Sequence, residues 1–195
     1  MAETNTIRAR PVKGPPIIQS EVFAMIIFVF ADVMFFAGFI SAYALVGARA
    51  PVGWWPPPGD PALPVAAAGG ATVALLLSGA AVFYAGWAAR SSLANAVRPL
   101  GVALALAVGF LGYQVFEFVR LLGVGFTLQS SAHGGFFYTM VGAHGLHAMS
   151  AVAVLAWAMR LVAAGTLSPG AFGAVRLYWY FVVLLWPAIY LTVYL

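Results

Sequence analysis

The chain has 195 residues, of which 64% are hydrophobic and only 7% are charged. Lys and Arg total 9 and Asp and Glu total 5, which gives a formal net charge of +4. In soluble domains roughly a quarter of all residues are charged. The much lower charged fraction of this chain therefore predicts an integral membrane protein. The lack of cysteine excludes disulfides, iron–sulfur clusters and thiolate metal sites. Basic residues lie singly at the ends of apolar runs, which argues against a nucleic-acid partner.

Five apolar segments are long enough to cross a membrane as helices, because a spanning helix needs roughly 20 residues. Membrane-spanning strands are shorter and alternate in polarity. The predicted fold class is therefore all-α: a polytopic membrane protein with a bundle of five transmembrane helices. The spans fall at about 20–46, 63–89, 99–123, 135–161 and 172–195. Residues 20–195 then form a single domain, preceded by a cytoplasmic tail at 1–19.

The connections between the spans predict their order in the bundle and an orientation. The segment at 90–98 is short, so the second and third spans should be antiparallel neighbours. With the N-terminus inside, Arg49 and Arg120 face outward. Seven basic residues then face inward, namely Arg8, Arg10, Lys13, Arg90, Arg98, Arg160 and Arg176. The positive-inside rule therefore favours the N-terminus inside and the C-terminus outside.

Five polar residues inside the predicted spans are the candidate functional groups: Asp32, Gln114, Glu117, His144 and His147. Ionisable residues at this depth are costly and mark either function or a packed polar network. At a rise of about 1.5 Å per residue, His147 lies at the level of Asp32, and His144 lies nearer the level of Glu117. We therefore expect a contact between Asp32 and His147. We also expect a hydrogen-bonded cluster of Gln114, Glu117 and His144.

These residue types favour a structural or proton-linked network over catalysis. His144 and His147 share a helical face, but the third histidine, His133, is placed at the outer edge, so a haem with two axial histidines is disfavoured. No catalytic triad, phosphate loop or nucleotide fingerprint is present in the sequence. We therefore expect no catalytic residue, metal or cofactor site in this chain. Proton conduction by the same polar groups remains the alternative to a purely structural network.

Four runs of residues resemble the haem–copper oxidase (cytochrome c oxidase) subunit III family, in that family's order. The run FVFADVMFFAGF at 28–39 resembles F-x-x-S-E-V-M-F-F-x-G. The run LGYQVFEF at 111–118 is similar to L-G-x-Q-x-x-E-[WY]. The run at 125–147 contains GFT and FYTMVGAHGLH, similar to G-F-T and F-Y-x-x-T-G-x-H-G-x-H. The run YWYFVVLLW at 178–186 resembles Y-W-H-F-V-D-x-x-W.

The chain departs from that pattern at several positions. Asp32 replaces the family's glutamate, Ala31 its serine and Val141 its threonine, and the His and Asp of the last motif are Tyr180 and Val183. These departures leave open an accessory subunit of a quinol oxidase, a nitric oxide reductase or another respiratory complex. A different class, an autonomous proton-linked carrier using Asp32 and Glu117, is disfavoured because paired broken helices are missing.

The resemblance implies the five-helix bacterial type of subunit III, in the bacterial inner membrane. Such a subunit is non-catalytic: it packs against catalytic subunit I and other oxidase subunits, binds phospholipid, and supports proton uptake or oxygen access. Haem and copper are then expected in the partner subunits, where oxygen is reduced to water with proton translocation. A strip of small residues on the first span, Gly38, Ser41 and Ala42, lies beside Phe35 and Phe39. We expect this strip to meet a partner subunit; the alternative is packing against the chain's own helices.

Overall fold

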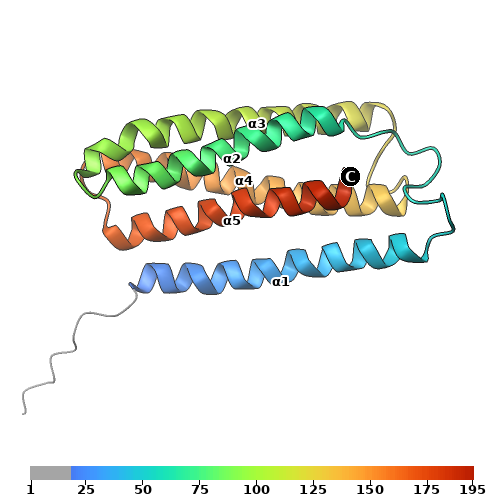
Figure 1. Cartoon of the computed structure of the whole chain (residues 1–195), viewed down its shortest axis with the longest axis horizontal. Coiled ribbons are helices and arrows are strands. Elements are labelled where there is room, and N and C mark those ends of the chain that lie inside the picture. Colours follow the sequence, from blue (N-terminus) through green and yellow to red (C-terminus); the bar gives the residue numbers. More distant parts are fainter. Residues whose placement is uncertain (1–18) are drawn as a thin grey trace, which may run out of the picture.

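A computed structural model describes residues 19–195, so the predicted tail lies outside the described residues except for its last residue. The described part is all-helical and contains no strand (Figure 1). It consists of α1 (Ser20–Arg49), α2 (Val65–Ala88), the short 3₁₀ helix η1 (Leu93–Ala96), α3 (Val97–Gly123), α4 (Ala132–Ala163) and α5 (Pro169–Val193). All five α-helices are long and apolar enough to cross a membrane. The predicted all-α fold with five spans is therefore confirmed, and the observed ends differ from the predicted ones by at most three residues.

Serine caps explain why two helices begin earlier than apolarity alone predicts. The Ser131 hydroxyl accepts a hydrogen bond from the Gly134 N–H at 2.9 Å, and α4 starts directly after this serine. The Ser168 hydroxyl accepts from the Ala171 N–H at 3.1 Å, and Pro169 occupies the first turn of α5. Such caps satisfy backbone donors that the first turn of a helix leaves free. Proline is favoured at the first helical position for the same reason.

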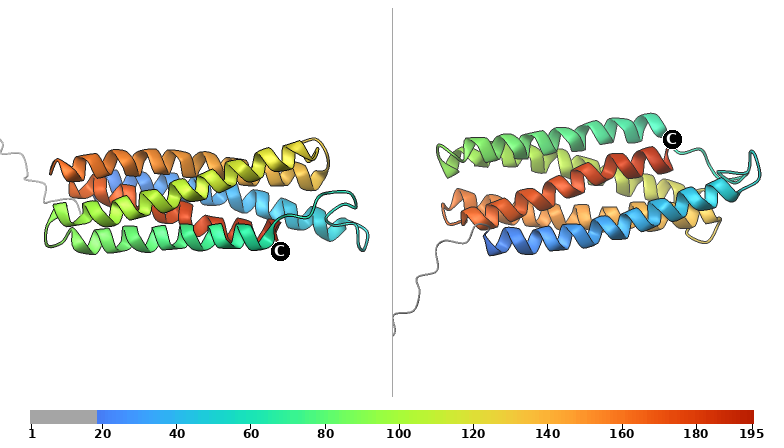
Figure 2. Two further views of the ribbon diagram at one scale, coloured as in Figure 1. Left: turned by 90° about the horizontal axis from the view of Figure 1, so that it is seen from above. Right: turned by 60° about the horizontal axis from the view of Figure 1, so that its bottom comes forward.

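The helices α2, α3, α4 and α5 form a four-helix bundle, and α1 lies outside it (Figures 1 and 2). The predicted antiparallel pair, α2 and α3, lies side by side. Among the described residues, no Cα atom of α3 comes within 8 Å of one in α5, and the same holds for α2 and α4. These two pairs are therefore the diagonals of the bundle. Helix α1 packs along α5 and touches α4, but it approaches neither α2 nor α3 this closely.

Trp186 of α5 joins the four bundle helices at their axis. The side chain is completely buried. Its indole N–H donates to the hydroxyl of Thr72 on α2 at 2.8 Å. Its ring centroid lies 5.0 Å from those of Phe110 on α3 and His144 on α4. One side chain thus contacts each of the other three helices of the bundle.

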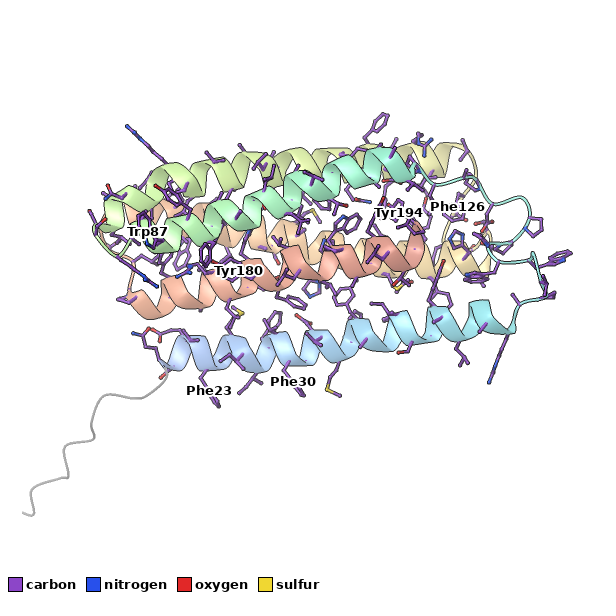
Figure 3. The ribbon with its side chains drawn as sticks, viewed as in Figure 1. Phe23, Phe30, Trp87, Phe126, Tyr180 and Tyr194 are labelled. Carbon is purple, nitrogen blue, oxygen red and sulfur yellow. The ribbon has the colours of Figure 1, made fainter. Side chains whose placement is uncertain are left out.

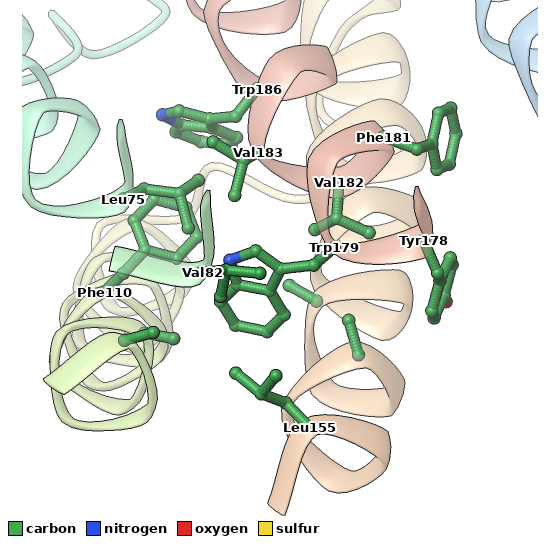
Figure 4. Close-up of a cluster of buried hydrophobic side chains, with 14 of the residues drawn as sticks. Leu75, Val82, Phe110, Leu155, Tyr178, Trp179, Phe181, Val182, Val183 and Trp186 are labelled. Carbon is green, nitrogen blue, oxygen red and sulfur yellow. The ribbon is translucent and has the colours of Figure 1, made fainter. Parts of the chain in front are cut away.

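Small residues on α2 allow α5 to approach closely. Figure 4 shows Leu75 and Val82 of α2 near Trp179 and Val183 of α5. Gly79 is buried between them, and a Cβ atom at this position would lie 2.9 Å from Cγ1 of Val183. Close backbone approach at small residues is the usual basis of helix packing in lipid. The small-residue composition of this span is therefore explained by packing.

Substituting Gly79 with leucine should destabilise the bundle, because Val183 blocks the space the new side chain needs. Overpacking of this kind costs about 1–3 kcal/mol. Gly70→Leu on the same helix is the matched control, since nothing lies within 4 Å of a Cβ there. Thermal unfolding of the detergent-purified variants would measure the difference. Equal melting temperatures for the two variants would contradict the proposed packing constraint.

Candidate functional site

The predicted contact between Asp32 and His147 is present between α1 and α4. Nε2 of His147 lies 3.3 Å from Oδ2 of Asp32, and the two side chains are 21% and 17% exposed. The separation is that of an ion pair, although no aligned hydrogen bond joins the two atoms. Phe36 packs edge-on against the imidazole at 5.5 Å. The pair therefore lies in a largely apolar contact between an outer helix and the bundle.

The other nitrogen of His147 contacts the backbone of its own helix. Nδ1 lies 2.8 Å from the carbonyl oxygen of Ala143. A carbonyl oxygen can only accept, so Nδ1 carries a hydrogen. Nε2 then lies opposite the Asp32 carboxyl group without an aligned hydrogen bond, so two ionisable side chains lie side by side between α1 and α4.

Two residues that the sequence analysis did not single out adjoin His147. The hydroxyls of Ser150 and Tyr178 lie 2.5 Å apart, so one of them donates to the other, and they lie 2.8 and 3.3 Å from the carbonyl oxygen of His147, which accepts from the remaining hydroxyl hydrogen. Ser150 follows on α4, and Tyr178 comes from α5. Only Ser150, three residues after His147, lies where helical spacing could have suggested it. The three helices α1, α4 and α5 thus meet at one group of polar side chains.

Gln114 and Glu117 of α3 are buried as expected, but the predicted cluster with His144 is not formed. Gln114 is 4% exposed and Glu117 is 1% exposed. None of the side-chain polar atoms of Gln114, Glu117 or His144 has a hydrogen-bond partner in the described part of the chain. His144 instead packs against the rings of Trp186 and Phe110. The prediction of one hydrogen-bonded cluster was wrong because matching depth does not make side chains point toward each other.

The neighbours of Glu117 are two tyrosines that the sequence analysis did not identify. The carboxyl group faces the hydroxyls of Tyr113 and Tyr194, and the amide of Gln114 also faces Tyr194. Tyr113 precedes Glu117 by four residues, so helical spacing could have revealed it. Tyr194 follows the last residue of α5 and approaches across the bundle (Figure 3). No local sequence signal identifies Tyr194 as a neighbour.

A third polar group joins the α1–α2 connection to the start of α4. Oδ2 of Asp60 accepts a hydrogen bond from the Ser131 hydroxyl at 2.7 Å and lies 3.0 Å from Nδ1 of His133. His133, expected at the edge, is only 1% exposed. The rings of Tyr43, Trp55 and Phe126 surround its imidazole at 5.6–6.2 Å. Asp60 was missed because it lies in a proline-rich loop whose path no periodic pattern predicts.

The residues present do not fit a haem or copper centre. Within residues 19–195, no group of three or more His, Cys, Asp or Glu residues is arranged to hold a metal ion. His133 is directed to Asp60, His147 to Asp32 and Ala143, and His144 lies among aromatic rings. The three imidazoles therefore serve three separate contacts and do not converge on one point.

Comparison with known proteins identifies the family. The sequence pattern of the family described as "Cytochrome c oxidase subunit III" matches residues 13–195. The chain is 31% identical to cytochrome c oxidase subunit 3 of Synechocystis over 182 residues, covering 90% of this chain and 75% of the relative. It is 30% identical to the subunit of Formosania lacustris, covering 92% and 71%. A protein of Nocardia farcinica, named probable cytochrome c oxidase subunit 3, is 28% identical, covering 87% and 84%. The chain is a multi-pass membrane protein and belongs to the cytochrome c oxidase subunit III family.

Proposed function

We propose that the chain is a non-catalytic accessory subunit of a bacterial haem–copper terminal oxidase. The match to the subunit III family across residues 13–195 carries this proposal. The separate partners of the three histidines support it, because they leave electron transfer and oxygen reduction to metal centres in other subunits. Catalytic subunit I, which holds haem and copper in such oxidases, is the expected partner. An accessory role in a quinol oxidase or a nitric oxide reductase is the second candidate, favoured by the departures at Tyr180 and Val183.

Purification in mild detergent tests this proposal. A tagged chain should co-purify with a haem-bearing subunit, and the haem spectrum and substrate oxidation of the assembly would separate the candidate complexes. Oxidation of reduced cytochrome c with oxygen uptake supports the first candidate. Oxidation of quinol, or reduction of nitric oxide, supports the second. Recovery of the chain alone and free of haem would support an autonomous carrier instead.

The proposal includes an orientation in the bacterial inner membrane. The ends of α2 and α4 and the starts of α3 and α5 lie at the same end of the bundle (Figure 1). Arg90, Arg98, Arg160 and Arg176 lie at this end. The positive-inside rule places this end, with the tail, in the cytoplasm. Reporter fusions to both termini test it, and an external N-terminus would overturn it.

Helix α1 supplies the surface that we assign to the partner subunit. Only Phe36 and Tyr43 of its 30 residues are buried. Gly38 and Ser41 are exposed, nothing lies within 4 Å of a Cβ at Gly38, and Phe35 is 46% exposed. Gly38 and Ser41 therefore face away from the chain's own helices, and Ala42 is half-buried, which supports a partner contact over internal packing at the first two positions. A smooth strip flanked by aromatic rings suits close contact with another transmembrane helix.

Gly38→Leu should therefore weaken assembly without unfolding the chain. The structure has room for the new side chain, so its bulk would oppose only a partner that approaches α1. Gly112→Leu on α3 is the matched control, since a Cβ there also meets nothing within 4 Å and α3 lies away from α1. The yield of the chain bound to the haem-bearing subunit is the measurement. Equal retention of both variants would show that the strip is not the interface.

Two apolar grooves on the bundle are suitable for lipid chains, which the proposal includes as ligands. One, of about 400 Å³, lies between α1 and α5 and is lined by residues such as Val29, Val33 and Leu184. The other, of about 530 Å³, lies between α3 and α4 and is lined by residues such as Val115, Leu146 and Met149. Their almost wholly apolar walls match acyl chains rather than polar headgroups.

The contact between the ionisable side chains of Asp32 and His147 is the basis for a proton-linked role. Asp32→Asn should remove this proton-exchanging acid while keeping a side chain that can hydrogen-bond, so assembly should be retained and turnover should slow. Asp60→Asn is the matched control, because Asp60 also pairs with a histidine but lies outside the spans. Oxygen consumption and proton uptake of the purified assembly would be compared. Unchanged turnover and proton uptake in Asp32→Asn would remove the proton-linked role.

A further inference from the structure

A cleft lies where the end of α2 turns back through η1 into α3. It has a volume of about 610 Å³, and its lining includes the polar side chains of Ser91, Asn95 and Arg98 and the rings of Tyr84 and Trp87. The two apolar grooves described above offer no such combination of a cation, hydrogen-bonding groups and aromatic rings. The cleft lies at one end of the bundle, where the chain emerges from the hydrocarbon region of a membrane (Figure 1).

The positive charge in this cleft is not neutralised by the chain itself. Arg98 is exposed and forms no ion pair with any of residues 19–195. The sequence contains no Asp or Glu between Asp60 and Glu117, so α2, η1 and the start of α3 carry no acidic side chain. Arg90 adds a second positive charge at the same end without lining the cleft. The cleft therefore favours an anionic ligand.

The polar wall of the cleft is held in place by two hydrogen bonds. The Asn95 amide nitrogen donates to the Ser91 hydroxyl at 3.2 Å, and this hydroxyl donates to the carbonyl oxygen of Ala88 at 3.0 Å. An amide nitrogen carries two hydrogens, so Asn95 can donate a second bond, and the Arg98 guanidinium offers five N–H donors. Phosphate oxygens accept such bonds, and a planar guanidinium can bind a phosphate through two parallel ones.

The aromatic rings of the cleft indicate that a lipid carries the anion. Tyr84 and Trp87 stack with their centroids 5.6 Å apart, and they are 56% and 61% exposed. Trp87 lies near the end of α2 (Figure 3). Exposed Tyr and Trp side chains in membrane proteins concentrate at the level of the lipid headgroups. Phe83 and Val102 are also exposed, so the surfaces of α2 and α3 beyond the cleft suit acyl chains.

We propose that Arg98 and Asn95 bind the phosphate of an anionic phospholipid, such as phosphatidylglycerol, in this cleft. Basic pockets between transmembrane helices are common binding sites for anionic headgroups. Phosphatidylcholine has the same phosphate, but its ammonium group would be repelled by Arg98 and Arg90. This inference depends neither on the proposed oxidase function nor on the two apolar grooves, because the cleft is lined only by residues between 84 and 99.

Photo-crosslinking with lipid analogues tests the proposal. The full-length protein, in the assembly with which it purifies, is placed in phosphatidylcholine nanodiscs that contain a small fraction of diazirine-bearing phosphatidylglycerol or diazirine-bearing phosphatidylcholine. Mass spectrometry then locates the crosslinked residues. We expect the phosphatidylglycerol analogue to label residues 84–99 severalfold more than the phosphatidylcholine analogue does.

Substitutions of the two arginines separate a specific site from general attraction. Arg98→Gln should lower the labelling by phosphatidylglycerol about tenfold, because a charge-assisted hydrogen bond is lost. Arg98→Lys keeps the charge and should retain much of the labelling. Arg90→Gln is the matched control, since it removes the same charge at the same end of the bundle outside the cleft. Labelling in this variant should stay close to that of the unmodified protein.

Four results would overturn the proposal. Equal labelling by the two lipids in the unmodified protein would mean that the cleft selects no anionic headgroup. Equal losses in Arg98→Gln and Arg90→Gln would mean that only general attraction to this end of the bundle operates. Displacement of phosphatidylglycerol by millimolar inorganic phosphate would mean that the cleft binds a free anion. Absence of labelling by both lipids would mean that another part of the assembly covers the cleft. If Arg98→Gln does not fold, the comparison of the two lipids in the unmodified protein still decides.

Discussion

The contacts of Trp186 hold the bundle together at its axis. Helices in lipid gain little from apolar burial alone, so side-chain fit and internal hydrogen bonds decide how they assemble. A buried indole N–H needs an acceptor, and Thr72 supplies one while donating its own hydroxyl hydrogen to Ala68. This bond fixes the position of α5 along the bundle axis relative to α2. The same axial position brings Val183 against Gly79 and, about three turns further along, Tyr194 to the level of Glu117.

The few polar groups in this apolar chain are distributed over three different contacts. Asp60 joins a loop to the start of α4, Asp32 joins α1 to α4, and Glu117 lies on the bundle axis. Asp60 and Asp32 each have a histidine partner from the chain itself. Glu117 is the most deeply buried of the three and has no such partner among the described residues. The polar groups that its carboxyl group faces are instead the uncharged hydroxyls of Tyr113 and Tyr194.

Helix α1 packs less of its surface against the rest of the chain than the other four helices do. Each bundle helix packs against at least two neighbouring helices, whereas α1 packs along α5, touches α4 and leaves most of its surface free. Its apolar outer face would suit lipid as well as protein, so apolarity does not distinguish them. The open, small-residue strip at Gly38 and Ser41 does distinguish them, because a smooth strip favours close approach of another helix. The proposed interface therefore rests on shape, not on hydrophobicity.

The sequence by itself determined the five spans, their ends to within three residues, and the family through four ordered motifs. These are local properties, since length, apolarity and motif spacing do not depend on which helices are neighbours. The depth of a residue in the membrane also follows from its position within its own span. This depth was enough to predict the contact of Asp32 with His147. Only the tertiary structure decided lateral contacts. Glu117 meets Tyr194 rather than His144, and Asp60 reaches His133, because rotation about a helix axis and the path of a loop are set by packing.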